Sequence, residues 1–234
     1  MDETKLIQYA TRIIIIFMCT PIHEFAHAWA ATKLGDETPR YQGRLTLNPI
    51  AHIDPLGAVA LFFAGFGWGK PVQVNSNRFK HYRRDLALTA LAGPVSNFLL
   101  AFMGIIIEKL FFRLFIVNGD AEAVFNYALT GKCNDPLYYV SLIFFYFTAV
   151  NIGLAVFNLI PVFPLDGEKI LNYFTGKKFD AFMRRNQLYI TIGFVVLLVS
   201  GLLNRPLGWV QGQLYDFMDF ITGWADSLFS AIIK

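Results

Sequence analysis

The sequence predicts an all-α polytopic membrane protein, and three observations lead to that prediction. Hydrophobic residues make up 55% of the 234 residues and charged residues 16%, a balance outside that of soluble domains. The chain contains 24 Phe, more than a soluble core of this size could bury. Four apolar runs approach or exceed the ~20 residues that a helix needs to cross a bilayer.

The expected spans follow one another in a single membrane domain, 1–234, with its core at 6–204. The four spans are residues 7–31, 86–110, 137–160 and a slightly short run at 188–204. Residues 56–67 (LGAVALFFAGFG) are too short to cross and contain several Gly, which predicts a re-entrant, interfacial or hairpin-like element. Residues 207–233 mix aromatic residues with Asp and predict an amphipathic interfacial helix, with a fifth span as the alternative.

The basic residues predict the orientation of the chain. The stretches 33–48, 70–84 and 169–185 hold 13 of the 20 Lys and Arg, and a four-span chain places all three on one side. The positive-inside rule makes that side cytoplasmic, which predicts a multi-pass protein of the plasma membrane, embedded in the lipid bilayer. A net charge of +3, without a basic cluster interleaved with aromatic residues, argues against nucleic-acid binding. A homo-oligomer is compatible with the sequence.

Two imidazoles and a carboxylate lie inside the first expected span, in the stretch PIHEFAHAW. His23 and His27, four residues apart, share one face of a helix, and Glu24 lies beside that face. In HExxH helices, two imidazoles bind zinc and the Glu acts as general base. The alternative is a buried, hydrogen-bonded trio without a metal. An ionisable residue costs roughly 2.5 kcal/mol or more at the centre of a membrane helix, which favours a functional group.

A catalytic zinc usually has three protein ligands, and the sequence offers few candidates for the third. His52 and His81 lie in polar stretches. Asp166 follows the third expected span in FNLIPVFPLDGEKIL, where two Pro residues break the helix; a broken helix at membrane depth is tolerated where it lines a cavity. His23 and Asp166 both lie toward the cytoplasmic side, so they can meet there. The alternative is that Asp166 caps a short helix at 167–174.

Two of these stretches, HEFAH in a first membrane helix and NLIPVFPLDG in a later one, together resemble the site-2 protease family of intramembrane zinc metalloproteases. Three further stretches resemble the compact bacterial and archaeal branch of that family: GRLTLNPIAHIDPLG at 43–57, GWGKPVQVN at 67–75 and ALAGPVSN at 90–97. The resemblance covers about residues 20–175. The PDZ domain of other branches is expected to be missing.

The resemblance implies a role for each matching site residue. It implies that one zinc ion per chain is bound by His23, His27 and Asp166. Glu24 would be the catalytic acid and base. Asn158 matches the Asn before the Pro-rich turn, to which the family assigns the substrate backbone or the oxyanion. Glu168 departs from the family, in which a small residue more often follows Asp-Gly.

The segment KPVQVN at 70–75 alternates like a strand after a Gly-rich stretch. We expect Val72 and Val74 to form part of an edge that pairs with a locally unwound substrate, and a plain hairpin in a cytoplasmic loop is the alternative. His52, with its neighbour Asp54, is expected to bind substrate or to support the site, or else to be a solvated loop residue.

These observations predict an intramembrane zinc metalloendopeptidase that hydrolyses membrane-spanning protein substrates, with Glu24 as general base. A membrane zinc transporter is one alternative, but it would need a second ligand-rich helix, and none of the other expected spans holds a His. A catalytically inactive binding scaffold is the other alternative. The presence of Glu24 together with all three presumed ligands argues against an inactive scaffold.

Overall fold

The structure is a computed structural model that describes residues 3–64, 67–131 and 135–233, and its regular elements are helices. The α-helices are α1 (Glu3–Ile14), α2 (Thr20–Lys33), α3 (Thr38–Tyr41), α4 (Pro55–Ala64), α5 (Tyr82–Asn118), α6 (Ala121–Thr130), α7 (Pro136–Asn158), α8 (Asp166–Thr175), α9 (Lys177–Arg185), α10 (Gln187–Val199), α11 (Asn204–Ile221) and α12 (Gly223–Ile232). Shorter turns are the π-helical η1 (Ile15–Cys19) and the 3-10 helices η2 (Pro49–Ala51) and η3 (Ser76–Arg78).

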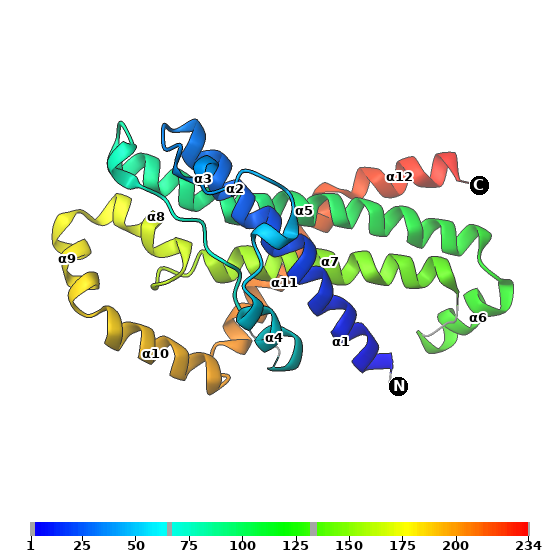
Figure 1. The fold of residues 1–234 in the computed structure, drawn as a ribbon. Coiled ribbons are helices and arrows are strands. Elements are labelled where there is room, and N and C mark those ends of the chain that lie inside the picture. Colours follow the sequence, from blue (N-terminus) through cyan, green and yellow to red (C-terminus); the bar gives the residue numbers. More distant parts are fainter. Residues whose placement is uncertain (1–2, 65–66, 132–134, 234) are drawn as a thin grey trace.

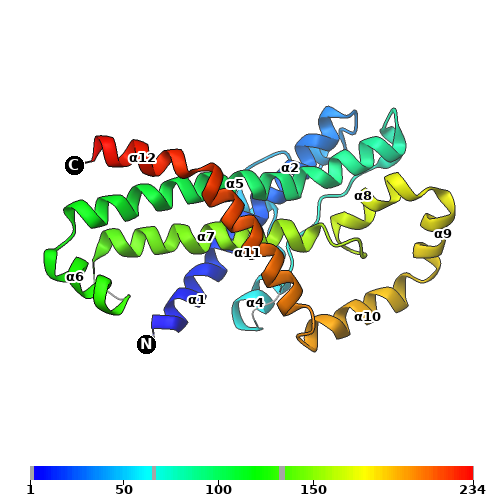
Figure 2. The same ribbon diagram turned by 180° about the vertical axis from the view of Figure 1, so that it is seen from behind.

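The long helices α5 and α7 lie side by side and form the centre of the molecule (Figure 1). The continuous helix α1–η1–α2 crosses them on one face, and α11 crosses them on the opposite face (Figure 2). At one end of the pair, α8, α9 and α10 curve away from α7, and at the other end α6 connects α5 to α7 (Figure 1). The segments that carry the predicted ligands, α2 and the start of α8, therefore both approach the central pair.

The core between α5, α7 and α11 consists of small and branched apolar side chains. Its buried members are Ala101, Ile105, Ile152, Val156 and Met218. Gly104 allows the close approach of the two central helices, because a Cβ there would lie 2.5 Å from Thr148 Oγ1. Small residues at such a position let membrane helices pack backbone against backbone, which explains why α5 and α7 form a stable platform for the site.

A π-helical turn interrupts the first long helix directly before the HExxH sequence. Pro21 has no N–H to donate to the carbonyl of Phe17, as an α-helix would require. The chain instead widens over Ile15–Cys19, and the N–H of Thr20 bonds to the oxygen of Ile15, five residues back. Such π turns are frequent at functional sites, and this one lies one turn before His23.

The structure supports a membrane protein but does not confirm four spans. Among the described residues, two helices are long and apolar enough to cross a bilayer, Tyr9–Lys33 and Pro136–Asn158. A third span results if Lys178–Arg185 and Gln187–Val199, which are bent by 69°, count as one. Residues 86–110, expected as the second span, lie within the 37-residue α5, which is not among these candidates.

Two smaller elements were expected at 56–67 and at 70–75. No strand and hence no hairpin occurs in the described residues; the segment at 67–75 makes one isolated bridge, between Ile53 and Gly69. It is tied instead to side chains of neighbouring elements, described below, and Pro71 removes a ladder donor. For residues 56–67, the structure has the 10-residue helix α4, while residues 65–66 lie outside the described part, so the re-entrant position stays a prediction.

The expected helix at 207–233 is divided in two. It becomes α11 and α12, which meet at the buried Thr222. Lys109 of α5 pairs with Asp219 at 2.9 Å and with Asp226 at 2.6 Å, so one largely buried cation ties both helices to the central pair. The C-terminal helices are thus bound to the protein core through charges, and the interfacial position of this region in the membrane stays a prediction.

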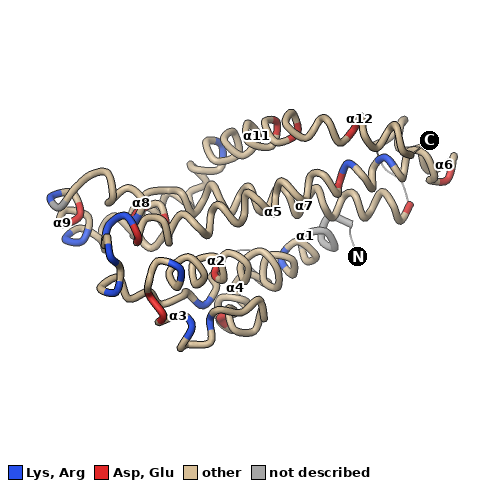
Figure 3. Tube along the Cα trace, turned by 90° about the horizontal axis from the view of Figure 1, so that it is seen from above, with Lys and Arg blue, Asp and Glu red and all other residues tan. Residues whose placement is uncertain are grey.

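The middle parts of α5 and α7 are free of charged residues (Figure 3). Lys and Arg of the loops around α3, of the start of α5 and of α9 lie toward the same end (Figure 3). This is the arrangement that the positive-inside rule requires if that end faces the cytoplasm.

Candidate active site

His23 and His27 lie on one face of α2 and are both buried, at 7% and 8% exposure. Their Nε2 atoms are 3.0 Å apart, and their rings meet edge to face. Because the two residues are separated by about one helical turn, local sequence alone brings the rings together. The predicted pair is therefore present as a pair of converging nitrogen atoms.

Asp166 joins this pair from 143 residues further along the chain. Its Oδ2 lies 3.2 Å from Nε2 of His23 and 3.1 Å from Nε2 of His27. The Pro-containing turn after α7 returns the chain so that α8 begins beside α2. Gly167 is required for this return, because a Cβ there would lie 2.2 Å from the oxygen of Leu159.

The alternative role of Asp166, capping α8, is wrong. The residue before it, Leu165, occupies the N-cap position, and Asp166 is the first helical residue. Its Oδ1 accepts a hydrogen bond from Lys169 Nζ at 3.3 Å. A carboxylate binds a metal ion as the anion.

The three side chains fit a zinc ion. Their ligand atoms lie within 4.8 Å of one another, and the three separations run from 3.0 to 3.2 Å. Tetrahedral zinc with bonds of ~2.0–2.1 Å places neighbouring ligand atoms about 3.3 Å apart. Two imidazoles and a carboxylate also match the donor set of catalytic zinc sites, which keep a fourth position open for water or substrate.

The other ring nitrogens of the two histidines are held by α5. Nδ1 of His23 lies 2.6 Å from Oδ1 of Asn97, and Nδ1 of His27 lies 2.7 Å from the carbonyl oxygen of Thr89. Both partners are acceptors, so each Nδ1 carries the proton and each Nε2 keeps its lone pair for a metal. Gly93 makes room for the rings, because a Cβ there would lie 2.5 Å from Nε2 of His27 and 2.6 Å from Cε1 of His23.

Asn97 is itself fixed by a buried polar chain. Its Nδ2 donates to Oδ1 of Asn151 at 2.9 Å, and Nδ2 of Asn151 donates to Phe147 O at 2.8 Å and to Cys19 Sγ at 3.3 Å. Asn97, Asn151 and Cys19 have no exposed surface. The chain links η1, α5 and α7, so the orientation of His23 depends on all three elements.

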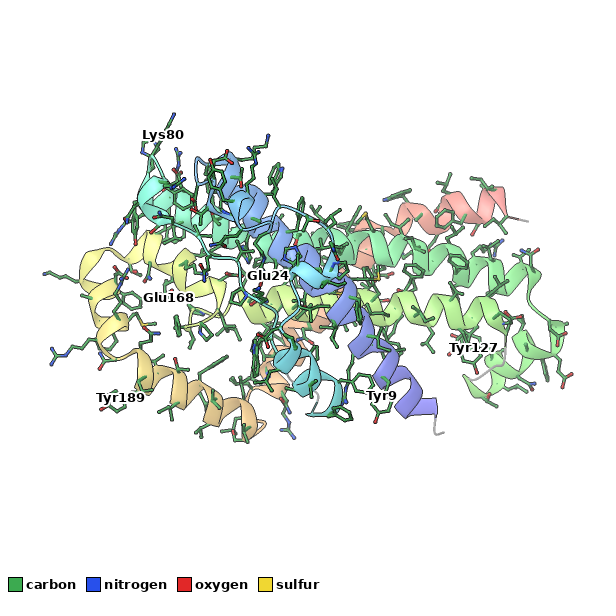
Figure 4. All side chains as sticks on the ribbon, viewed as in Figure 1. Tyr9, Glu24, Lys80, Tyr127, Glu168 and Tyr189 are labelled. Carbon is green, nitrogen blue, oxygen red and sulfur yellow. The ribbon has the colours of Figure 1, made fainter. Side chains whose placement is uncertain are left out.

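The carboxylate of Glu24 bonds to the segment at 67–75. Its Oε2 accepts a hydrogen bond from the backbone N–H of Val72 at 2.8 Å. Figure 4 places Glu24 in the middle of the molecule, far from both termini. Glu24 is not one of the three candidate ligands, and its role as general base stays a prediction.

Comparisons with known proteins agree with this geometry. The sequence profile of peptidase family M50 matches residues 11–200. The chain belongs to peptidase family M50. This confirms the site-2 protease resemblance. YwhC of Bacillus subtilis, named as a zinc metalloprotease, is 37% identical to this M50 peptidase over 225 residues, which cover 95% of this chain and 92% of YwhC.

More distant relatives carry similar names. Rip2 of Mycolicibacterium smegmatis, also named as a zinc metalloprotease, is 28% identical over 240 residues, covering 98% of this M50 peptidase and 82% of Rip2. The zinc metalloprotease MJ0392 of Methanocaldococcus jannaschii is 26% identical over 212 residues, covering 89% of this chain and 48% of MJ0392. No solved structure matches the chain.

His52 of this M50 peptidase is neither solvated nor part of the metal group. It is fully buried, and its Nε2 lies 2.8 Å from the carbonyl oxygen of Thr46. Burial lowers the pKa of His52, so the ring is neutral and Nε2 carries the proton that it donates. Asp54 accepts from the N–H of Gly57 at the start of α4. Both residues therefore shape the loop before α4.

Asn158, Glu168 and His81 are not members of the metal group. Asn158 is the last residue of α7, and its amide donates to Leu154 O at 2.9 Å within the same helix. Glu168 accepts from Asn172 Nδ2 at 2.6 Å. His81 is the N-cap residue of α5. The role of Asn158 toward a substrate stays a prediction.

Sequence reasoning missed the residues that hold the histidines. Asn97 and Gly93 belong to ALAGPVSN, which carried the family resemblance without an assigned role, and Asn151 was not singled out. The available signal was chemical: an Asn inside an apolar run needs a partner, because an unpaired amide is costly at that depth. The sequence does not show which residue is the partner of such an Asn, because that partner lies on another helix.

Proposed function

We propose that this M50 peptidase is an intramembrane zinc endopeptidase that hydrolyses peptide bonds of membrane-spanning proteins. One observation supports this most directly: His23, His27 and Asp166 converge within 3.0–3.2 Å of one another in an apolar region, with Glu24 beside them. All three ligands come from one chain, so one zinc ion per chain is proposed and a homo-oligomer is not required. The relatives named as zinc metalloproteases support the choice of metal.

Each residue of the group has a separate task. The two imidazoles and Asp166 would hold the ion, which when bound would lower the pKa of a water molecule to about 7 and polarise the substrate carbonyl. Glu24 takes a proton from the attacking water and passes it to the leaving amine. Asn158, at the end of α7, is proposed to donate to the substrate backbone or the oxyanion in exchange for its present bond to Leu154.

The substrate is proposed to pair with the segment at 70–75. Val72 and Val74 are partly buried and Pro71 and Gln73 are exposed, as in an extended chain with one covered side. The N–H of Val72 is used by Glu24, and nothing in the described residues accepts from the N–H of Gln73. Because backbone groups alternate in an extended chain, Gln73 directs its N–H away from α2. That edge is free to bind an unwound substrate strand.

Replacing Gln73 with Pro tests this pairing. The substitution removes the outward N–H and leaves the Val72 donor of Glu24 intact, so cleavage of a membrane-spanning substrate should fall while zinc content stays the same. Gln73→Ala is the matched control, because it keeps the backbone donor and loses only the side chain, which contacts Gln42. Equal cleavage by the Pro and Ala variants would show that this edge does not bind substrate.

The location is proposed to be the plasma membrane, with several spans and with the active site toward the cytoplasm. The clustering of Lys and Arg at the end that holds α3, α9 and the start of α5 supports this orientation (Figure 3). Asp166 and the HExxH histidines lie on the elements that lead to this end.

Reconstitution in liposomes distinguishes the protease from its rivals. We expect the purified chain to cleave members of a panel of single-span test proteins that carry Asn-Pro pairs at different depths, because a helix must unwind locally to be cut. No zinc flux is expected. Zinc flux without cleavage would instead establish a transporter, and bound zinc with neither activity would establish a scaffold.

A further inference from the structure

Arg44 is a buried cation without a carboxylate partner. Its residue surface is 5% exposed, and no ion pair to it occurs in the described part of the chain. Its Nη2 donates to the carbonyl oxygen of Lys70, and its buried Nε has no hydrogen-bond partner among the described atoms. Burying a charge in this way is costly, which indicates a function beyond packing.

His52 and Arg44 together bind the backbone of Lys70. The carbonyl oxygen of His52 accepts from the N–H of Lys70 at 2.8 Å, while Arg44 donates to the carbonyl of the same residue. Nδ1 of His52 faces Nη2 of Arg44 at 3.4 Å and acts as the acceptor, because its Nε2–H is used by Thr46. The loop at 43–54 therefore holds both backbone groups of Lys70.

The held segment lies directly on α2 at the HExxH sequence. Two residues after Lys70, the N–H of Val72 donates to Oε2 of Glu24 at 2.8 Å. One residue before it, Gly69 lies so close that an added Cβ would be 2.5 Å from Cγ2 of Thr20 and 3.9 Å from Cγ of Glu24. Burial lowers the pKa of Arg44 and the Glu24 carboxylate raises it, so the two charges also interact across this segment.

We propose that Arg44 is a positioning residue for Glu24. It holds residues 69–72 against α2, so that the Val72 N–H binds one carboxylate oxygen and leaves the other directed for proton transfer. This gives the stretch at 43–57 a function: it supports the general base rather than binding the metal. The inference rests on the proposed protease activity and on Glu24 as its base.

Arg44→Met is the direct test, with Arg40→Met as the matched control because Arg40 is exposed and pairs with Glu37. Steady-state cleavage of the best-cut member of the panel should show kcat reduced roughly 100-fold, the scale expected for a misplaced catalytic group, with KM little changed. Zinc content should equal that of the wild type. Hydrogen exchange of the backbone at 69–75 should become faster. Arg44→Lys should recover part of kcat, since it keeps the charge and one donor.

A second variant tests the same segment without changing Arg44. Gly69→Ala should displace the segment from Thr20 and lower kcat, and adding Thr20→Ser, which removes the clashing methyl, should restore it. If Arg44 acts through the Val72 donor, then Arg44→Met should cause little further loss of kcat in a Val72→Pro background.

Several outcomes would overturn the proposal. One is a wild-type kcat in Arg44→Met, and another is loss of zinc in that variant. The third is a double variant in which the fold-reductions of kcat by Arg44→Met and Val72→Pro multiply. Should Arg44→Met fail to fold, a wild-type kcat in Gly69→Ala would be decisive against it. Failure of the proposed function is distinct, because the wild type itself would then cleave nothing.

Discussion

Replacing Glu24 with Gln is expected to abolish peptide hydrolysis and to leave zinc binding intact. The amide has nearly the same shape and can still accept from Val72 N–H, but it cannot take a proton from water. General-base catalysis contributes roughly 10²–10⁴-fold, so cleavage should fall at least by that factor. The measurement compares cleavage of the test panel with zinc content per chain, on the same purified samples.

A matched control for this variant is Glu122→Gln, because Glu122 is exposed on α6 at the far end of the central pair (Figure 1). It should behave like the wild type. Cleavage by Glu24→Gln at an undiminished rate would remove Glu24 from the mechanism. Loss of zinc in Glu24→Gln would make it a ligand instead of a base.

Replacing Asp166 with Ala is expected to release the metal. The remaining group would be two imidazoles 3.0 Å apart, one ligand short of the three that catalytic zinc usually takes from the protein. The loss of affinity should exceed the roughly 10–100-fold that follows when a residue supporting a ligand is removed. Competition with a chelator, followed by metal analysis, gives the zinc content and the affinity.

Glu168→Ala is the control for Asp166→Ala. It removes a carboxylate from the same turn of α8, but one that bonds to Asn172 and not to the histidines. We expect it to keep about one zinc ion per chain at wild-type affinity. If Asp166→Ala held zinc as firmly as Glu168→Ala, the third ligand would have to be sought elsewhere.

The features that follow from sequence alone are those set by neighbours along one helix. His23 and His27 share a face because four residues make about one turn, and the structure places them together and buried. Glu24 beside them, the apolar helices around Tyr9–Lys33 and Pro136–Asn158, and the membership of peptidase family M50 were likewise predictable. A pattern of residue type and spacing contains all of this information.

Chain segments far apart in sequence account for what the sequence could not show. The number of spans, the divided C-terminal helix and the absence of a hairpin in the described residues depend on which surfaces pack together. The sequence at 67–75 alternates like a strand. However, the Val72 N–H donates a hydrogen bond to Glu24 and the Asn75 N–H donates one to Asp36, so the segment pairs with side chains instead of a second strand.

The complete site exists only in the tertiary structure. Asp166 reaches His23 across 143 residues, Asn97 holds its other nitrogen across 74, and Val72 binds Glu24 across 48. Gly93 and Gly167 permit these approaches because a side chain at either position would collide with the site or with the preceding turn. Spacing along one helix specifies two ligands and a base, whereas the third ligand and the residues that orient all of them depend on how α2, α5, α7 and α8 pack.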